Sequence, residues 1–261
     1  MAYGTVVADV MQTSTPNGVL GAKNASTLQN RLIDAGFIIN QRGYVSGTAL
    51  SAGTYAHDRW KAGAGGCTYT FTQGSAGVPI VITITAGSLQ QVIEGCNMPE
   101  GGTYVLSWTG TAQARFNGGT YGSSPLAVTG ITAGANTTIE FNTGTLSYPQ
   151  LEVGSSATGF EYRQYQQELS LCQRYYETAT YTSNGFQFLS LLLQTPSNWW
   201  SQYNYKVTKR AIPTFAIVSG SWTYSTPTIS TAVDCIQFNA SSLFYLTGTS
   251  GNNAGSFSAE L

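Results

Sequence analysis

Residues 148–176 divide this chain, because the hydrophobic period changes within them. Leu151 and Val153 alternate with polar neighbours, as in the last strand of a sheet. Residues 154–159 then break the alternation with glycine and serine, and apolar residues at helical spacing occupy residues 164–176. We therefore predict a β domain before this stretch, a short linking helix over residues 164–176 and a second β domain after it.

The predicted helix has one apolar face. Helical spacing places Leu169, Cys172 and Tyr176 on that face, with Glu168 and Arg174 on other faces. We expect the apolar face to be the packed one.

Low charge favours strands in the rest of the chain. Charged residues make up only 9% of the sequence, whereas it contains 16 Tyr, 11 Phe and 5 Trp. Surface helices normally need Glu, Lys and Arg, while aromatic, Thr and Val residues favour strands. Turn signals such as Gly63–Gly66 and Gly74–Gly77 separate alternating segments between residues 31 and 163. We predict about eight to ten strands in this region, with the spacing of a sandwich or jelly roll and a two-sheet sandwich as the first choice.

The chain is therefore expected to be all-β: a jelly-roll β-sandwich followed by a short helix and a second, smaller β domain. Residues 1–30 form a predicted N-terminal arm for attachment to a partner or for oligomer contact, and 31–163 form the sandwich. Residues 164–176 form the linking helix and 177–261 the C-terminal β domain, and the two domains are expected to pack tightly. Strands of the last domain are predicted at residues 186–193, 203–207, 214–218, 221–224, 235–238, 243–246 and 256–261.

Charge and hydropathy argue against several partners. The formal net charge is -1 without a basic run, so we expect no nucleic-acid binding. No segment approaches the roughly twenty apolar residues that span a bilayer, so we expect no membrane insertion. The N-terminus lacks the features of a signal peptide, which predicts assembly in a cytoplasm.

The cysteines and acidic residues indicate no metal site and no cofactor. Cys67, Cys96, Cys172 and Cys235 are scattered, without the C-x-x-C pairs typical of structural zinc. Two disulfides remain an alternative, but four free, buried thiols are the preferred interpretation.

The single histidine, His57, is a weak candidate for a catalytic base. It lies beside Asp58, and adjacent residues on a strand point to opposite faces, so Asp58 is poorly placed to orient it. We interpret Asp58, Arg59 and Trp60 as a structural corner, in which the charged pair ties down loops and Trp60 enters the core.

Paired carboxylates would be needed for glycoside hydrolysis. Glu152 and Glu161 flank the junction and could converge, but we expect Arg163 and Arg174 to neutralise them. A hydrolase is therefore a minor alternative.

A cluster of aromatic residues indicates carbohydrate binding, because sugars bind to flat aromatic faces with amides and hydroxyls nearby. The densest cluster contains Trp199, Trp200, Tyr203 and Tyr205, and Trp222 is a further candidate. Alternation would bury one of Trp199 and Trp200 and expose the other. The competing interpretation is that these side chains fill a core that contains few Leu residues.

Several motifs, in their order and spacing, resemble bacteriophage tail-fibre and related virion fibre proteins, whose domains are similar to jelly-roll carbohydrate-binding modules. They are N-R-L-I-D-A-G-F-I-I-N-Q-R-G (30–43), Y-A-H-D-R-W (55–60), P-Q-L-E-V-G-S-S-A-T-G-F-E (149–161) and E-L-S-L-C-Q-R-Y-Y (168–176).

Weaker matches, including K-R-A-I-P-T (209–214) and the final F-S-A-E-L, extend the resemblance over nearly the full length. Within the motifs, Gln150, Glu152 and Arg174 are interpreted as scaffold residues. Val153 and Gly159 stand where the family often has proline, which predicts a looser junction loop.

The resemblance implies a virion protein, a homotrimer that attaches to other virion proteins through its arm and binds bacterial surface polysaccharide. We therefore predict a non-catalytic phage fibre or adhesin. The alternatives are a structural head, collar or tail decoration protein without receptor binding, and a glycan depolymerase.

Overall fold

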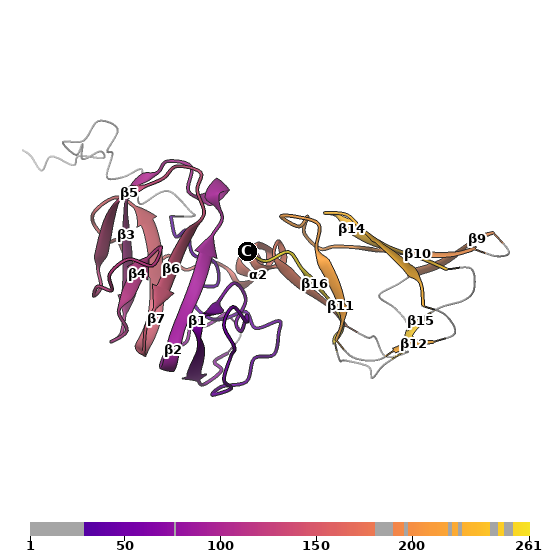
Figure 1. Ribbon diagram of the computed structural model, residues 1–261, viewed down its shortest axis with the longest axis horizontal. Helices are drawn as coiled ribbons and strands as arrows, with labels where there is room; N and C mark the ends of the chain where they lie inside the picture. Colours follow the sequence, from indigo (N-terminus) through magenta and orange to yellow (C-terminus); the bar gives the residue numbers. More distant parts are fainter. Residues whose placement is uncertain are drawn as a thin grey trace, which may run out of the picture.

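The computed structural model describes residues 29–75, 77–180, 190–195, 198–218, 221–223, 226–240, 245–247 and 253–261. These residues form two β domains with an α-helix between them, as Figure 1 shows. The predicted fold class, an all-β sandwich followed by a short helix and a smaller β domain, is confirmed. No helix within these segments is long and apolar enough to cross a membrane.

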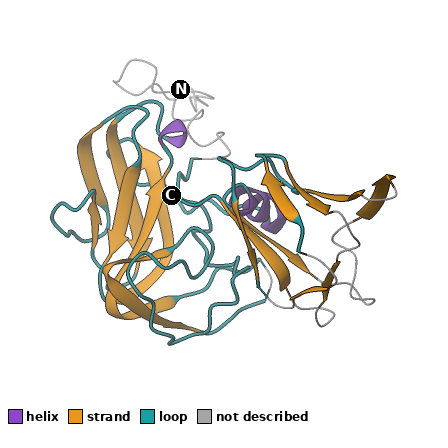
Figure 2. Ribbon diagram, turned by 45° about the vertical axis from the view of Figure 1, so that its right-hand side comes forward, coloured by secondary structure: helices purple, strands orange, loops and turns teal. Residues whose placement is uncertain are grey.

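One antiparallel sheet of seven strands builds the first domain (Figure 2). The strand order is β4-β6-β2-β7-β3-β5, and β1 pairs with β2. One end of β2 pairs with β7 through Ile82–Ile84, and the other end pairs with β6 through Leu89–Ile93. β2 therefore joins the two parts of the sheet, which enclose a single core. The strands are β1 (Lys61–Phe71), β2 (Ile82–Ile93), β3 (Gly102–Thr109), β4 (Ala114–Phe116), β5 (Leu126–Ile131), β6 (Thr137–Phe141) and β7 (Gly144–Val153).

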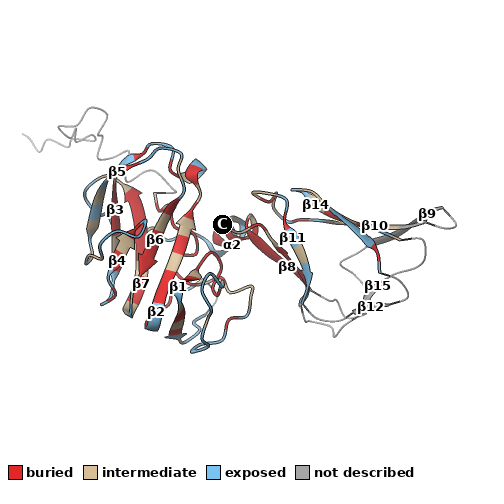
Figure 3. Cartoon of the chain, in the orientation of Figure 1, coloured by how far each residue is buried: buried red, intermediate tan, exposed pale blue. Residues whose placement is uncertain are grey.

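Buried residues of these strands form that core (Figure 3). Ile82 and Ile84 of β2 are buried against Ile139 and Phe141 of β6 and the rest of one continuous cluster. Full burial of such a side chain stabilises the fold by about 1.5–3 kcal/mol. Trp60 joins the same cluster and donates its indole N–H to the carbonyl of Asp34 over 2.9 Å.

The predicted turn at Gly63–Gly66 is wrong, because these residues lie inside β1. Their glycines form a bulge, and the register of β1 on β2 shifts between Ala62 and Cys67. Opposite the bulge, Gly87 has φ +70°, and a Cβ there would overlap the carbonyl of Gly66. Glycine therefore allows two strands to approach closely here instead of turning the chain.

The linking helix, α2, spans Tyr165–Gln173 and is shorter than predicted. Cys172 is buried as expected, but Tyr176 begins the next strand. Glu168 is also buried, which corrects its predicted position on another face. Its carboxylate accepts a hydrogen bond from the backbone N–H of Asp34 and pairs with Arg163, so burial does not leave the charge alone. A short 3-10 helix, η1, covers Gly95–Asn97.

The described part of the second domain contains three small antiparallel sheets. Their orders are β13-β14-β10-β9, β11-β16-β8 and β12-β15. Ile236, Phe238 and Phe257 form its core with Ala179 and Tyr205. The strands are β8 (Tyr176–Thr180), β9 (Ser190–Thr195), β10 (Asn198–Asn204), β11 (Thr214–Ile217), β12 (Ser221–Thr223), β13 (Thr228–Thr231), β14 (Cys235–Ala240), β15 (Tyr245–Thr247) and β16 (Asn253–Ser258).

The strand predictions for this domain are correct in part. β8 and β13 were missed, and the strand predicted at residues 203–207 is β10, which ends at Asn204. The strand predicted at 256–261 is β16, which ends at Ser258, because the last residues leave the sheet to contact the sandwich.

Residues 259–261 connect the two domains. The carboxylate of Glu260 pairs with Arg59 and, over 3.0 Å, with Arg42. Lys61 Nζ and the Tyr55 hydroxyl donate to the carbonyl of Leu261 over 2.8 and 2.6 Å. The domains are therefore joined by a largely buried polar contact.

The sandwich is also tied to the chain before its first strand. Asn30 is buried, and its side-chain oxygen accepts hydrogen bonds from the backbone N–H groups of Leu32 and Leu151 over 3.0 Å. Residues 1–28 of the predicted arm lie outside the described residues.

Candidate functional site

His57 lies inside the sandwich core. Residues 57–59 form a turn and not a strand, and the imidazole packs among the rings of Phe37, Tyr44, Tyr69 and Phe71. Its Nδ1 is 2.7 Å from the Tyr69 hydroxyl, and burial lowers the pKa of His57 to about 4. A neutral, enclosed imidazole of this kind stabilises the core.

Asp58 and Arg59 belong to the contact between the domains. Asp58 is fully buried and accepts hydrogen bonds from Gln41 and, over 3.4 Å, from Arg42. Burial raises the pKa of Asp58 to about 7. The Arg59 guanidinium pairs with Glu260 and lies 3.6 Å from the centre of the Tyr175 ring.

Gln150 and Glu152 hold the loop that follows β7. Glu152 accepts hydrogen bonds from the backbone N–H of Thr158 over 2.7 Å and from Gln150 over 3.2 Å. Gln150 in turn accepts one from the backbone N–H of Glu161 over 2.7 Å. These buried side chains fold residues 154–161 back along the sheet.

The predicted neutralisation of Glu152 and Glu161 needs correction. Arg163 does pair with Glu161, over 3.7 Å, but Arg174 pairs with Glu94 over 3.2 Å. For Glu152, amide and hydroxyl donors supply the contacts that arginine was expected to make. Arg174 contacts Glu94, the residue before η1, because the fold brings these distant parts of the sequence together.

The aromatic cluster of the second domain is partly core. Tyr205 is buried, and Tyr203 stacks on Phe257 with ring centres 5.1 Å apart while its hydroxyl donates to Glu177. This corrects the expectation for Tyr205, whose ring is closed to a sugar. Trp200 is half-buried. The side chains of Trp199 and Trp222 lie outside the described part, so the expected alternation at Trp199 and Trp200 stays a prediction.

The described aromatic side chains that are most exposed lie elsewhere, where α2 meets the sandwich. Tyr162 is 69% exposed and Tyr165 is 37% exposed. The Tyr162 ring meets the Phe160 ring edge-on, at 89° and 5.0 Å between centres, and Phe160 meets Tyr148 at 5.2 Å. These contacts fix the orientation of Tyr162 and leave much of its ring open to solvent.

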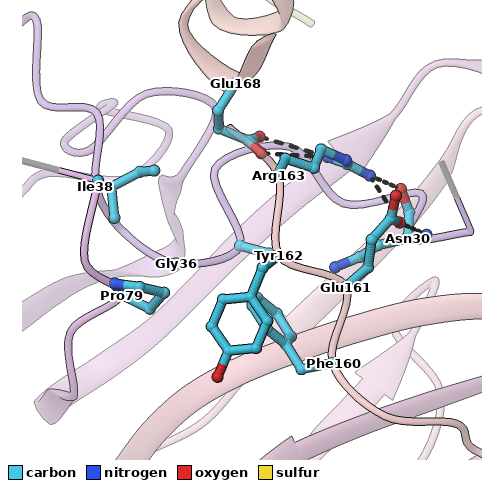
Figure 4. Close-up of a pocket in the computed structure, with 11 residues that line it drawn as sticks. Asn30, Gly36, Ile38, Pro79, Phe160, Glu161, Tyr162, Arg163 and Glu168 are labelled. Carbon is cyan, nitrogen blue, oxygen red and sulfur yellow. Dashed lines mark hydrogen bonds and ion pairs between the residues drawn. The ribbon is translucent and has the colours of Figure 1, made fainter. Parts of the chain in front are cut away.

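A small pocket of about 20 Å³ lies beside Tyr162 (Figure 4). Ile38 and Pro79 lie on one side of the Tyr162 ring, and the ion-paired Arg163 and Glu161 lie on the other. We call this pocket, together with the rings of Phe160 and Tyr162, the junction site. Sequence reasoning missed it, because exposure of a tyrosine follows from the fold and not from the density of aromatic residues.

The charges at the junction site are mutually compensated. The side chain of Arg163 lies between Glu161 and Glu168, with N–O distances of 3.7 and 3.4 Å, and donates to the carbonyls of Asn30 and Leu32. Burial raises the pKa of Glu168, although Arg163 opposes the shift. Arg163 is therefore already ion-paired and hydrogen-bonded within the protein.

A second pocket, of about 130 Å³, shares Asn30 and Arg163 with the junction site. Arg31, Asn97 and Leu171 also line it. Arg31 pairs there with Glu100 over 2.8 Å.

The cysteines are free, but they are not all buried. Cys67 and Cys172 are buried, Cys235 is half-buried and Cys96 is exposed. The expectation of four buried thiols is wrong for Cys96, which lies on η1 at the surface. In the described part of the chain, no group of three or more His, Cys, Asp and Glu side chains could hold a metal ion.

Comparisons of the chain with protein-family models, with curated proteins and with solved structures find no match.

Proposed function

We propose that this chain is a non-catalytic fibre or adhesin subunit of a phage virion that binds glycan on the bacterial surface. The virion assignment rests on the resemblance of the ordered motifs. Binding rests on one structural observation: the exposed ring of Tyr162, held by Phe160 beside a polar pocket. An oriented aromatic face next to a few fixed polar groups is the usual composition of a small-ligand site.

The pocket argues against a depolymerase. Glycoside hydrolysis needs a sugar between two carboxyl groups, and Glu161 and Glu168 both line the pocket. However, Arg163 lies between them, and a pocket of about 20 Å³ holds about one water molecule. A sugar would therefore rest on the surface over Tyr162.

We propose further that copies of the chain associate through the C-terminal domain, as a homotrimer, and attach to other virion proteins through residues 1–30. Residues 211–233 contain no charged side chain. Ile217, Val218, Ile229 and Val233 are exposed on or beside β11 and β13, which are edge strands. Symmetric contacts bring equivalent surfaces together, so an uncharged apolar surface suits a second copy.

The same surface favours a second candidate function, a decoration protein that only packs against neighbouring subunits. A cell-binding assay distinguishes the adhesin from the decoration protein. Labelled protein should bind host cells saturably, and purified surface polysaccharide should compete. Tyr162→Ala should weaken binding about tenfold, which corresponds to about 1.4 kcal/mol. Val45→Ala, an exposed site on the sandwich, should have no effect.

An oligomer that ignores every host surface would contradict the adhesin proposal and support the decoration role. Unchanged binding of Tyr162→Ala would remove the junction site from the proposal.

A further inference from the structure

We infer that the junction site takes an uncharged sugar residue, placed flat on Tyr162 with one small exocyclic group in the adjoining pocket. This inference rests on the proposed glycan binding and names the class of sugar.

The charges near the site disfavour an acidic sugar. The two nearby cations, Arg163 and Arg31, are paired with Glu161, Glu168 and Glu100. These are two positive and three negative groups, so the local charge is zero when Glu168 is protonated and -1 when it is ionised. A carboxylate or sulfate on the ligand would therefore meet a neutral or negative site in which each arginine is already ion-paired.

The shape of the site favours a sugar ring with a small substituent. The exposed ring of Tyr162 offers an apolar surface for the C–H face of a pyranose. The pocket beside it holds about one water molecule, which is the space of one hydroxyl or methyl group.

Gly36 keeps that space open. A Cβ at Gly36 would lie 3.2 Å from Pro79 and 3.3 Å from Ile38, so alanine would narrow the pocket. The φ angle of Gly36 is not in the left-handed region, so Gly36→Ala introduces crowding without left-handed backbone strain.

The test uses host surface polysaccharides that carry uronic acids, each before and after chemical reduction of its carboxyl groups, together with neutral polysaccharides. Reduction removes the charge and keeps the linkages, so each pair is matched. We expect binding to the neutral and reduced polymers, at least tenfold stronger than to the acidic forms. Affinity should change less than twofold between 50 and 500 mM NaCl, because little charge is involved.

Three variants locate the binding. Tyr162→Phe should keep the affinity, because the ring remains, and Tyr162→Ala should weaken it about tenfold. Gly36→Ala should weaken binding of sugars with an exocyclic group more than binding of a pentose polymer that lacks one.

The outcomes separate the two claims. Binding that prefers the acidic polymers and is abolished by salt would overturn the inference while leaving glycan binding intact. Binding to none of the polymers would overturn the proposed function, and the inference with it.

Discussion

At the scale of single residues, the sandwich buries several carboxyl groups near the domain contact. Asp34, Asp58 and Glu168 are all buried, and desolvation raises the pKa of each. Their neighbours are backbone N–H groups, Gln41, Arg42 and Arg163. These groups order the loops between the sandwich and α2, and they make stability depend on pH.

Asp58→Asn should reduce that dependence. The pKa of Asp58 is about 7 in the folded protein and near 3.8 when unfolded, so the folded state binds more protons between these values. Its contribution to the free energy of unfolding is therefore largest below pH 3.8 and is lost as pH rises to about 7. The difference between the two pKa values corresponds to about 4 kcal/mol in the free energy of unfolding.

Urea unfolding at pH 5 and pH 8 measures the effect. The wild-type protein should lose more stability than Asp58→Asn between these two values. Equal losses would show that Asp58 ionises normally in the fold.

At the scale of elements, sequence patterns predicted strands where side chains alternate and failed where backbone geometry decides. The alternation of Leu151 and Val153 with polar residues correctly predicted the strand β7. The glycines at 63–66 were assigned to a turn, because a bulge depends on the partner strand, which local sequence does not reveal. β13, T-I-S-T, lacks the alternation of a strand with one buried face.

The candidate site shows the same limit. Aromatic density indicated a site at residues 199–205, but Tyr205 is buried. Tyr162 lies in a polar segment with no local signal, and its exposure results from the packing of Phe160 and Tyr148 beneath it. In contrast, the sequence correctly placed Trp60 in the core.

Gly87→Ala tests the strand contact at the bulge. A methyl group there would overlap the Gly66 carbonyl, and φ +70° is unfavourable for alanine. We expect a loss of roughly 1–3 kcal/mol in the free energy of unfolding. Gly65→Ala, in the same bulge with open space around it, is the matched control and should change stability by less than about 0.5 kcal/mol. Similar losses in both variants would contradict the close approach.

At the scale of the whole molecule, residues 259–261 make the two domains one unit. Glu260→Gln should disrupt this contact, because Arg59 is almost fully buried and would lose its carboxylate. Breaking a buried pair from one side costs about 3–5 kcal/mol. Limited proteolysis should cut Glu260→Gln between the domains faster than the wild-type protein. Equal rates would show that the ion pairs do not hold the domains together.

Assembly is tested by Ile229→Lys. The substitution places a charge on exposed edge strand β13, where copies would bring identical charges together. Light scattering should report an oligomer for the wild-type chain and a monomer for Ile229→Lys. Val45→Lys, on the exposed surface of the sandwich, should remain oligomeric. A wild-type monomer, or an Ile229→Lys oligomer, would contradict association through this surface.

The central claim is that glycan binds at the junction site and not at the aromatic cluster of β10. Titration of one competing surface polysaccharide into Tyr162→Ala and Trp200→Ala tests it most directly, with melting temperatures as the check on folding. We predict that Tyr162→Ala loses at least tenfold in affinity at an unchanged melting temperature, while Trp200→Ala binds like the wild-type protein. Full affinity in Tyr162→Ala with loss in Trp200→Ala would contradict the claim and move the site to the C-terminal domain.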